Sequence, residues 1–497
     1  MSFSGIHDLK TLILSFHPVI AIETTEEERV ETLLKAVAGR LKLPLYVWTI
    51  TQGLKQYPQN KGVFNTDKPQ ALLKTLEGFH QEGIFLLKDF SQHLDDVVLA
   101  RQFREIAQRF SRDRATMVLT DAQIKLSPEL AMMAVYYDLE LPTQKELYDF
   151  FCAMLRSLRQ RHKIQVQLSQ KETKSIVQAL TGLTLHQARQ AIAYVALLDG
   201  KLHAADIKRL LDRKAQMLRE DGLLEYYAEA ENTYQLGGFQ NLKTWLNRAK
   251  VGFSPQARSL NLTPPKGILL VGVQGCGKSL AAKAIARTWQ LPLLKLDAGR
   301  LYSKYMGESE KNFRKAVQLA ESMAPAILWI DEIEKGFSSS SRGSSDGGLS
   351  QRLFATLLTW LQEKRQEVFV IATANDISRL PPELLRKGRF DEIFFVDLPD
   401  AAARQEIFRI HLSRHQQNPD NFNLDELALA TAGFGGAEIE QVAIASLYRA
   451  LYLQKPLDTA LLLDEIGKTI PLSVSRREDI QQLRSWAQQR FVNVHEQ

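Results

Sequence analysis

Short apolar runs alternate with amphipathic stretches between about residues 235 and 452. Apolar runs that predict strands occupy residues 268–271, 293–296, 326–330, 368–372 and 393–396. Helical patterns fill the gaps at residues 278–289, 308–321, 349–364 and 403–414. Strands that alternate with helices predict a parallel sheet with right-handed crossovers. From about residue 424 the strand patterns stop, and we expect only helices.

Residues 1–230 repeat this order of patterns. Strand-like runs occupy residues 19–22, 45–50, 84–87 and 117–119. Three short segments also match the later half in the same order: 126–130 with 380–384, 138–151 with 397–408, and 180–191 with 430–441. We therefore predict two copies of one α/β architecture in tandem. The alternative is a coincidence of strand–helix patterning.

The segment from Gly272 to Ser279, GVQGCGKS, fits the phosphate-binding loop pattern G-x-x-x-x-G-K-[ST], or Walker A. Glycines let successive backbone N–H groups surround phosphate oxygens, and the following helix adds the positive end of its dipole. Lys278 would reach the β- and γ-phosphates, and the Ser279 hydroxyl would ligate Mg²⁺. The alternative is an incidental glycine turn. We assign to a bound nucleotide the residues Gly272, Val273, Gln274, Gly275, Cys276, Gly277, Lys278, Ser279 and Leu280.

Two acids follow the apolar run at 326–330, as in a Walker B sequence. Strand ends in open α/β sheets face the ligand crevice, so Asp331 and Glu332 are expected beside the phosphates. Asp331 would hold Mg²⁺ through its water shell, and Glu332 would orient and deprotonate the attacking water. The alternative is an exposed acidic turn after a core strand. The phosphate-binding loop upstream favours the chemical interpretation.

Residues 235–452 resemble an AAA ATPase module, in motifs beyond these two. Asn375, just past the run at 368–372, matches the family's sensor-1 residue, which contacts the γ-phosphate or the attacking water. Arg386 and Arg389, in the segment RKGRF, match the family's second region of homology. The resemblance implies that both are arginine fingers acting on ATP bound by the neighbouring subunit. A finger supplied in trans makes assembly a condition of hydrolysis. The alternative is a basic surface turn.

Three glycine-containing segments resemble further parts of the AAA module. Gly436 and Ala437 match the sensor-2 segment, where small residues let the helical lid approach the nucleotide. Gly238 matches the linker that packs on the adenine at the start of the module. Residues 304–310 resemble the first pore loop, which implies that Tyr305 and Met306 grip an extended polypeptide. The alternatives are plain glycine turns and a tyrosine that packs on the next helix.

The first copy lacks this chemistry. Residues 23–28 read ETTEEE, without the glycines or the lysine of a phosphate-binding loop. Lys88 and Asp89 stand after the run at 84–87, so the paired acids are absent, and so is the arginine pair. We predict a degenerate module that cannot hydrolyse ATP and serves packing, ring stabilisation or partner recognition.

The layout of the whole chain resembles one divergent AAA group, the hypothetical-reading-frame proteins of algal plastids and cyanobacteria. We expect a P-loop parallel-sheet ATPase module with a C-terminal helical lid, preceded by the degenerate copy. The expected domains are 1–150, a degenerate AAA-like α/β domain; 151–230, its helical lid and a linker; 231–400, the AAA large domain; and 401–497, the helical lid and C-terminal helices.

Composition changes this picture little. Lys and Arg number 63 against 57 Asp and Glu, so the net charge of +6 is only a weak hint of an anionic partner. Two cysteines, Cys152 and Cys276, argue against a disulfide framework or a cysteine zinc site and favour a reducing compartment. No apolar run approaches the about 18 residues of a membrane span, and we find no secretory or transit peptide. We expect the cytoplasm of a cyanobacterium or the plastid stroma.

The motifs predict an ATPase that converts ATP and water into ADP and phosphate, with Mg²⁺. Our first hypothesis is a homo-oligomeric motor, a hexameric ring by resemblance, that remodels an unidentified protein client. The alternative is a nucleotide-dependent switch or adaptor without threading activity. Nucleic-acid remodelling is a weaker alternative, because the sequence has no zinc, RNA-recognition or helix-turn-helix signature. A fused metalloprotease is excluded because H-E-x-x-H does not occur.

Overall fold

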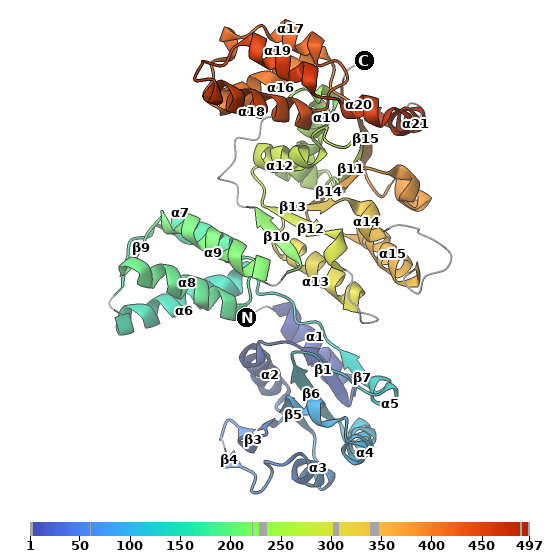
Figure 1. Cartoon of the computed structure of the whole chain (residues 1–497). Coiled ribbons are helices and arrows are strands. Elements are labelled where there is room, and N and C mark those ends of the chain that lie inside the picture. Colours follow the sequence, from blue (N-terminus) through green and yellow to red (C-terminus); the bar gives the residue numbers. More distant parts are fainter. Residues whose placement is uncertain are drawn as a thin grey trace. The chain divides into compact units, whose positions relative to one another are not determined.

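The computed structural model of the chain describes residues 3–59, 61–162, 164–220, 222–227, 236–301, 308–337, 347–386, 388–487 and 490–495. The chain forms two compact units, Met1–Leu210 and Leu211–Gln497, whose elements are labelled in Figure 1. Each unit contains its own sheet. No helix among the described residues combines the length and the apolar character that crossing a membrane requires.

The first unit begins with a sheet in the strand order β4-β3-β2-β5-β6-β1-β7. Its strands are β1 (Val19–Glu23), β2 (Leu45–Thr49), β3 (Gly53–Tyr57), β4 (Lys61–Gly62), β5 (Gly83–Lys88), β6 (Ala115–Asp121) and β7 (Ala134–Tyr136). Strands β3 and β4 add an antiparallel edge, and the other neighbours are parallel. One face packs on α1 (Phe3–Leu14) and α2 (Glu27–Leu41), and the other on α3 (Pro69–Glu77) and α4 (Val97–Asp113).

The rest of the first unit is mainly helical. After α5 (Pro128–Ala131) it contains α6 (Gln144–His162), α7 (Gln170–Leu180), α8 (Leu185–Asp199) and the start of α9 (Asp206–Glu220). Strands β8 (Gln165–Val166) and β9 (Lys201–Leu202) pair in parallel. Thr184 and Gln187 form a capping box, in which each side chain accepts the backbone N–H of the other, and this fixes where α8 begins.

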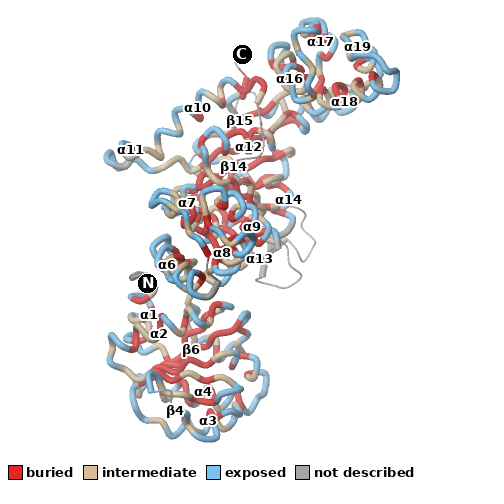
Figure 2. Tube along the Cα trace, turned by 90° about the vertical axis from the view of Figure 1, so that its left-hand side faces the viewer, coloured by how far each residue is buried: buried red, intermediate tan, exposed pale blue. Residues whose placement is uncertain are grey.

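The second unit contains a sheet in the order β10-β12-β13-β14-β11-β15-β16. Its strands are β10 (Leu224–Tyr227), β11 (Gly267–Gly272), β12 (Leu293–Asp297), β13 (Ala326–Asp331), β14 (Val368–Ala374), β15 (Glu392–Val396) and β16 (Val492–Asn493). Only β10 is antiparallel to its neighbour among these described strands. Every residue of β11 and β14 is buried, and Figure 2 shows buried residues concentrated along the strands.

Two sets of helices complete the second unit. The sheet is accompanied by α10 (Gln240–Lys250), α11 (Pro255–Ser259), α12 (Lys278–Trp289), α13 (Glu308–Ser322), α14 (Ile333–Phe337) and α15 (Gly347–Glu363). The lid consists of α16 (Ala401–Arg414), α17 (Leu424–Ala430), α18 (Gly436–Tyr452) and α19 (Thr459–Lys468), followed by α20 (Leu472–Ser475) and α21 (Arg477–Ala487). The lid has its own apolar core, which includes Phe408, Phe434 and Leu462.

The two sheets repeat one strand order. The five parallel strands of the first unit run β2-β5-β6-β1-β7, and the first five parallel strands of the second unit run β12-β13-β14-β11-β15. In both, the first parallel strand of the sequence lies between the fourth and the fifth. The predicted α/β fold with a tandem copy is therefore confirmed. The chain divides into compact units at Leu210, which is none of the predicted domain limits. The limits at residues 150, 230 and 400 therefore stay predictions.

One expectation about the C-terminal region is wrong. Helices alone were expected beyond residue 424, yet β16 pairs in parallel with β15, with Val492 opposite Phe394 and Asn493 opposite Phe395. Two residues are too few to show a strand periodicity in the sequence. The strand forms because β15 offers an open edge, where the N–H of Val494 donates to the carbonyl of Phe395 at 3.0 Å.

Candidate functional site

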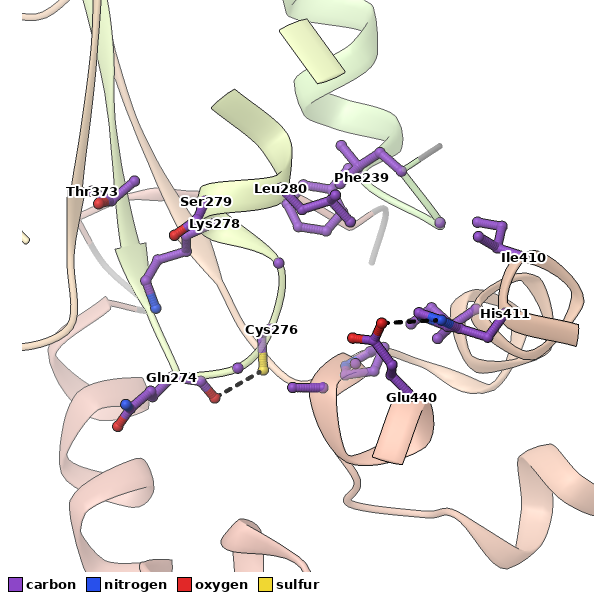
Figure 3. A pocket seen from close by; sticks show the side chains of 18 of the residues that line it. Phe239, Gln274, Cys276, Lys278, Ser279, Leu280, Thr373, Ile410, His411 and Glu440 are labelled. Carbon is purple, nitrogen blue, oxygen red and sulfur yellow. Dashed lines mark hydrogen bonds and ion pairs between the residues drawn. The ribbon is translucent and has the colours of Figure 1, made fainter. Parts of the chain in front are cut away.

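A cavity of about 670 Å³ opens in the second unit where β11, β13 and β14 end, beside the first turn of α12 and the lid (Figure 3). Its volume lies within the about 300–1,000 Å³ that is usual for small-molecule sites. The sequence-predicted residues that line it are Gln274, Gly275, Cys276, Gly277, Lys278, Ser279, Leu280, Asp331, Glu332, Asn375, Gly436 and Ala437.

Glycine geometry shapes the loop at the start of α12. Gly272 has a φ of 155°, and a Cβ there would stand 2.0 Å from the carbonyl oxygen of Val396 on the neighbouring strand. Gly277, directly before α12, has a φ of 92°, which an L residue rarely adopts. The backbone therefore turns tightly from β11 into α12. The N–H groups at the start of this helix face the cavity, as phosphate binding requires.

Lys278 is held inside this loop. Its ammonium group donates to the carbonyls of Gly272 at 2.8 Å and Val273 at 2.7 Å, and the residue is 6% exposed. Gly272 and Val273 do not line the cavity; they contact Lys278 instead. Burial lowers the pKa of Lys278 to about 8, because removing an ammonium from water disfavours its charged form.

The acid that ends β13 lies opposite this loop. Asp331 Oδ1 accepts a hydrogen bond from Thr373 Oγ1 at 2.7 Å and a longer one from Ser279 Oγ at 3.5 Å. These hydroxyl and carboxylate oxygens are the hard ligands that Mg²⁺ prefers, so the residues fit the predicted metal. Thr373 was not predicted, because a threonine inside a buried strand carries no chemical signal in the sequence.

Lys295 was also not predicted. It lies on β12 opposite Trp329 of β13, with its ammonium 4.7 Å from the centre of that ring. The same ammonium lies 3.1 Å from Oδ2 of Asp331, the oxygen that the hydroxyls do not contact. The two carboxylate oxygens of Asp331 therefore have separate partners, which fixes the orientation of the group.

The second acid and Asn375 are brought together. Glu332 has a φ of 49°, a conformation that costs a residue with a side chain about 1 kcal/mol or more. Its N–H donates to Thr373 Oγ1 at 3.1 Å, and its Oε1 accepts from Asn375 Nδ2 at 3.2 Å. The strained backbone turns the Glu332 carboxylate toward the cavity and the predicted sensor residue.

Apolar and aromatic groups form the other wall. Phe239 lies close to the loop, because a Cβ on Gly277 would meet its ring at 3.6 Å, and its ring centre is 5.5 Å from that of His495. Gly238 does not line the cavity, whereas its neighbours do. With a φ of 71° it makes the turn that aims Phe239, and its N–H donates to Glu406 Oε2 at 2.7 Å.

The lid closes the cavity from the side of α16 and α18. The N–H of Ala437 donates to the carbonyl of Gly275 at 3.0 Å, which ties the start of α18 to the glycine loop. His411 and Glu440 face each other across the lid, 3.6 Å apart (Figure 3), and burial lowers the pKa of His411. This pair was not predicted, since both residues lie in ordinary amphipathic helices.

Cys276 is buried between the loop and the lid. Its Sγ lies 3.9 Å from the carbonyl oxygen of Gln274, and it faces Gly435 at the start of α18. Burial raises the pKa of the Cys276 thiol to about 12. The side chain therefore stays a neutral thiol, which agrees with a small space-filling residue.

The predicted arginines do not line this cavity. Arg386 is exposed, and Arg389 is half-buried beside the side-chain amide of Gln362. An arginine that acts on a neighbouring subunit is expected outside its own site, so both assignments stay predictions. The pore-loop residues Tyr305 and Met306 lie outside the described residues.

The region of the first unit that corresponds to the cavity of the second unit carries charges of opposite sign. Glu27 begins α2 where Lys278 begins α12, and Lys88 ends β5 where Asp331 ends β13. Glu27 and Lys88 form an ion pair at 3.6 Å. The next residue, Asp89, keeps a left-handed φ of 55°. The turn after β5 therefore keeps the backbone conformation of the turn after β13, whereas the side chains of Glu27 and Lys88 pair with each other.

A carboxylate ties down the helical part of the first unit. Glu26 Oε1 accepts the N–H of Leu185, the first residue of α8, at 2.7 Å. Glu26 also pairs with Arg29 at 3.3 Å. The negative group thus occupies a helix N-terminus, a position that favours anions. These contacts fit the predicted degenerate module, which closes on its own side chains.

Comparisons with known proteins agree with this division. The chain matches the "ATPase family associated with various cellular activities (AAA)" over residues 268–398. Residues 6–139 match the "SpoVK-like AAA ATPase, N-terminal domain", and residues 145–221 match the "SpoVK-like AAA ATPase, second domain".

Some relatives match nearly the whole chain, and others match less than half of it. The "Uncharacterized AAA domain-containing protein ycf46" of Trieres chinensis is 36% identical over 97% of this chain and 96% of its own length. The protein of the same name from Pyropia yezoensis is 35% identical over 97% of each chain. The "Proteasome-activating nucleotidase" of Saccharolobus solfataricus is 38% identical over 39% of this chain and 50% of its own length. The chain therefore belongs to the AAA ATPase family and, within it, to the group of the ycf46 AAA proteins of algal plastids.

Proposed function

We propose that the second unit binds ATP with Mg²⁺ and hydrolyses it to ADP and phosphate. One observation carries this proposal: Lys278, Ser279, Asp331, Glu332 and Asn375 come from three separate segments, at the start of α12, the end of β13 and the turn after β14, and line one cavity. Membership of the AAA ATPase family supports the same activity.

Binding begins at the glycine loop. The backbone N–H groups before α12 receive the phosphates, and Lys278 exchanges its two carbonyl contacts for phosphate oxygens. Ser279 and Asp331 would hold Mg²⁺, which neutralises developing phosphate charge. The apolar wall with Phe239, together with the lid, receives the adenine base of ATP. Closure of the lid then excludes water from the site.

Hydrolysis needs a general base that accepts a proton from water, and a second group that orients this general base. The Glu332 carboxylate accepts the proton of the attacking water, whose oxygen bonds to the γ-phosphorus while the bond to the bridging oxygen of ADP breaks. Asn375 holds Glu332 Oε1 through its amide N–H at 3.2 Å. This contact orients the carboxylate, so that proton abstraction and attack occur in one geometry.

The Glu332→Gln variant tests this proposal. The amide keeps the shape of the side chain but cannot accept the proton, so we expect ATP binding within about threefold of wild type and turnover lowered at least about 100-fold. The matched control is Glu363→Gln, which changes an exposed glutamate of α15 in the same unit. Phosphate release by Glu332→Gln at the wild-type rate would show that Glu332 is not the base.

The hydrolytic site is completed by a second copy of the chain, in a ring that is hexameric by family resemblance. Arg386 is exposed and outside its own cavity, as an arginine acting on a neighbour would be. An apolar stripe on α18, formed by Tyr448, Leu451 and Tyr452, is 70–86% exposed and supports assembly through the lid. Light scattering with and without nucleotide tests this, and a protein that stays monomeric while hydrolysing ATP contradicts it.

The ring acts as a motor that remodels a protein partner. A relative named "Proteasome-activating nucleotidase" matches 39% of this chain and supports a protein substrate over a nucleic acid. Relatives from algal plastids support a location in the plastid stroma or the cyanobacterial cytoplasm. Tyr305→Ala separates a motor from a nucleotide switch: a motor loses remodelling and keeps ATPase activity, whereas a switch is indifferent. A basal ATPase rate that DNA or RNA raises would favour nucleic-acid remodelling.

A further inference from the structure

Glu334 is a buried acid that the predicted mechanism does not use. It lies on α14, three residues after Asp331, and is 5% exposed. One of its oxygens, Oε2, has no hydrogen-bond partner among the described residues. A buried carboxylate with an unsatisfied oxygen is costly, so the contact that its other oxygen makes calls for an explanation.

That contact is with the backbone of Asn375. Glu334 Oε1 accepts the N–H of Asn375 at 2.9 Å. Strand β14 ends at Ala374, which pairs with Val271, so the N–H of Asn375 lies beyond the ladder. Leaving this part-buried N–H without an acceptor would be costly. Glu334 supplies the acceptor at the residue where the chain leaves the sheet.

The side chain of Asn375 makes the second half of the connection. Its Nδ2 donates to Glu332 Oε1 at 3.2 Å, while its backbone N–H is held by Glu334. Glu332 lies in the turn after β13 and Glu334 in α14, which follows at once, whereas Asn375 lies in the turn after β14. Two hydrogen bonds therefore fix Asn375 between two carboxylates of one short segment.

We propose that Glu334 is a positioning residue that holds the backbone of Asn375, so that the Asn375 amide reaches the carboxylate of Glu332. This inference rests on the proposed hydrolysis. Burial raises the pKa of Glu334, and the Asn375 N–H opposes this by stabilising the charged form. The acceptor acts in either protonation state, because a carbonyl oxygen remains.

Two substitutions separate the acceptor from the volume of the side chain. Glu334→Gln keeps an oxygen acceptor, and Glu334→Met keeps a similar volume without one. Because misplacing a reacting group by about 1 Å can cost about 100-fold in rate, we expect Glu334→Met to lower turnover at least about tenfold. Nucleotide affinity should stay within about threefold in both variants, and Glu334→Gln should keep near-normal turnover. Glu363→Met, which changes an exposed residue of α15, is the matched control.

A double variant tests whether Glu334 acts through Asn375. On an Asn375→Ala background, Glu334→Met should lower turnover no further, because the amide that it positions is already absent. A full additional loss there, or wild-type turnover of Glu334→Met alone, overturns the inference. If the methionine variant does not fold, Glu334→Ala gives the same comparison, since it also lacks the acceptor.

Hydrogen exchange tests the contact without any activity. The Asn375 amide proton should exchange at least about fivefold faster in Glu334→Met than in wild type, as the loss of about 1 kcal/mol predicts, and at the wild-type rate in Glu334→Gln. Unchanged exchange in Glu334→Met overturns the inference. Faster exchange together with no ATPase activity in the wild type would keep the contact and reject the proposed hydrolysis.

Discussion

Nucleotide binding should depend on pH through Lys278. In the unliganded protein this side chain is 6% exposed and donates to two backbone carbonyls. Burial lowers its pKa from 10.5 to about 8. A bound triphosphate favours the charged lysine and raises that pKa again. Binding above pH 8 must therefore take up a proton, and nucleotide affinity falls as the pH rises.

The size of the effect follows from the value of the pKa. Below about pH 7 Lys278 is charged in both states, and affinity does not change with pH through this group. At pH 9 about ten of every eleven unliganded molecules carry a neutral lysine, so affinity should be about tenfold weaker than at pH 7. Cys276, with a pKa raised to about 12, and His411 and His495, with lowered pKa values, do not titrate between pH 7 and 9.

Calorimetry of ADP binding with Mg²⁺ measures this directly. In two buffers with different ionisation enthalpies, proton uptake should be about 0.1 at pH 7, 0.5 at pH 8 and 0.9 at pH 9. Lys278→Met should bind more weakly and without this pH dependence, whereas Lys315→Met, at an exposed lysine of α13, should keep it. Affinity that stays constant from pH 7 to 9 in the wild type refutes the reasoning, as does the same slope in Lys278→Met.

Three further changes have distinct readouts. Gly272→Ala should destabilise the second unit by about 3 kcal/mol, because its Cβ would stand 2.0 Å from the Val396 carbonyl; an unchanged calorimetric midpoint contradicts this. Glu26→Ala should speed amide exchange of Leu185 about fivefold through the loss of a helix-terminal acceptor, and unaltered exchange would argue against that contact. Arg386→Ala should abolish turnover alone and regain part of it when mixed with subunits that keep this arginine but carry a disrupted phosphate loop. No recovery on mixing rejects a role in trans.

The sequence predicted the parts of the fold that depend on neighbouring residues. The run at 326–330 became the core of β13, and the helix expected at 278–289 spans the same residues as α12. Both signals are local, since burial on both faces needs a continuous apolar run and a phosphate loop needs a fixed spacing of glycines. Of the residues that these motifs named, 274–280 together with Asp331 and Glu332 line one cavity, whereas Gly272 and Val273 do not.

Site residues whose partners depend on the pairing of strands were not predicted. Lys295 contacts Asp331 because β12 and β13 pair so that Lys295 lies opposite Trp329 and Asp297 opposite Asp331. From the sequence alone, a lysine within a strand is expected to face solvent. Thr373 was missed for the same reason, since only the alignment of β13 with β14 gives its hydroxyl a carboxylate to contact. The partners in the sheet, and no local pattern, give these side chains their place.

The C-terminal strand has a consequence for how the protein is made. Asn241, near the start of the second unit, donates its backbone N–H to the carbonyl of Val494 and its side-chain amide to that of His495, the residue beside Phe239. Asn241 and His495 are 254 positions apart, so at about 5–20 residues per second a growing chain holds Asn241 for about 13–50 s before His495 is added. The glycine loop is therefore synthesised well before this contact can form, and nucleotide bound by the growing chain lacks the part of the cavity wall that His495 contributes.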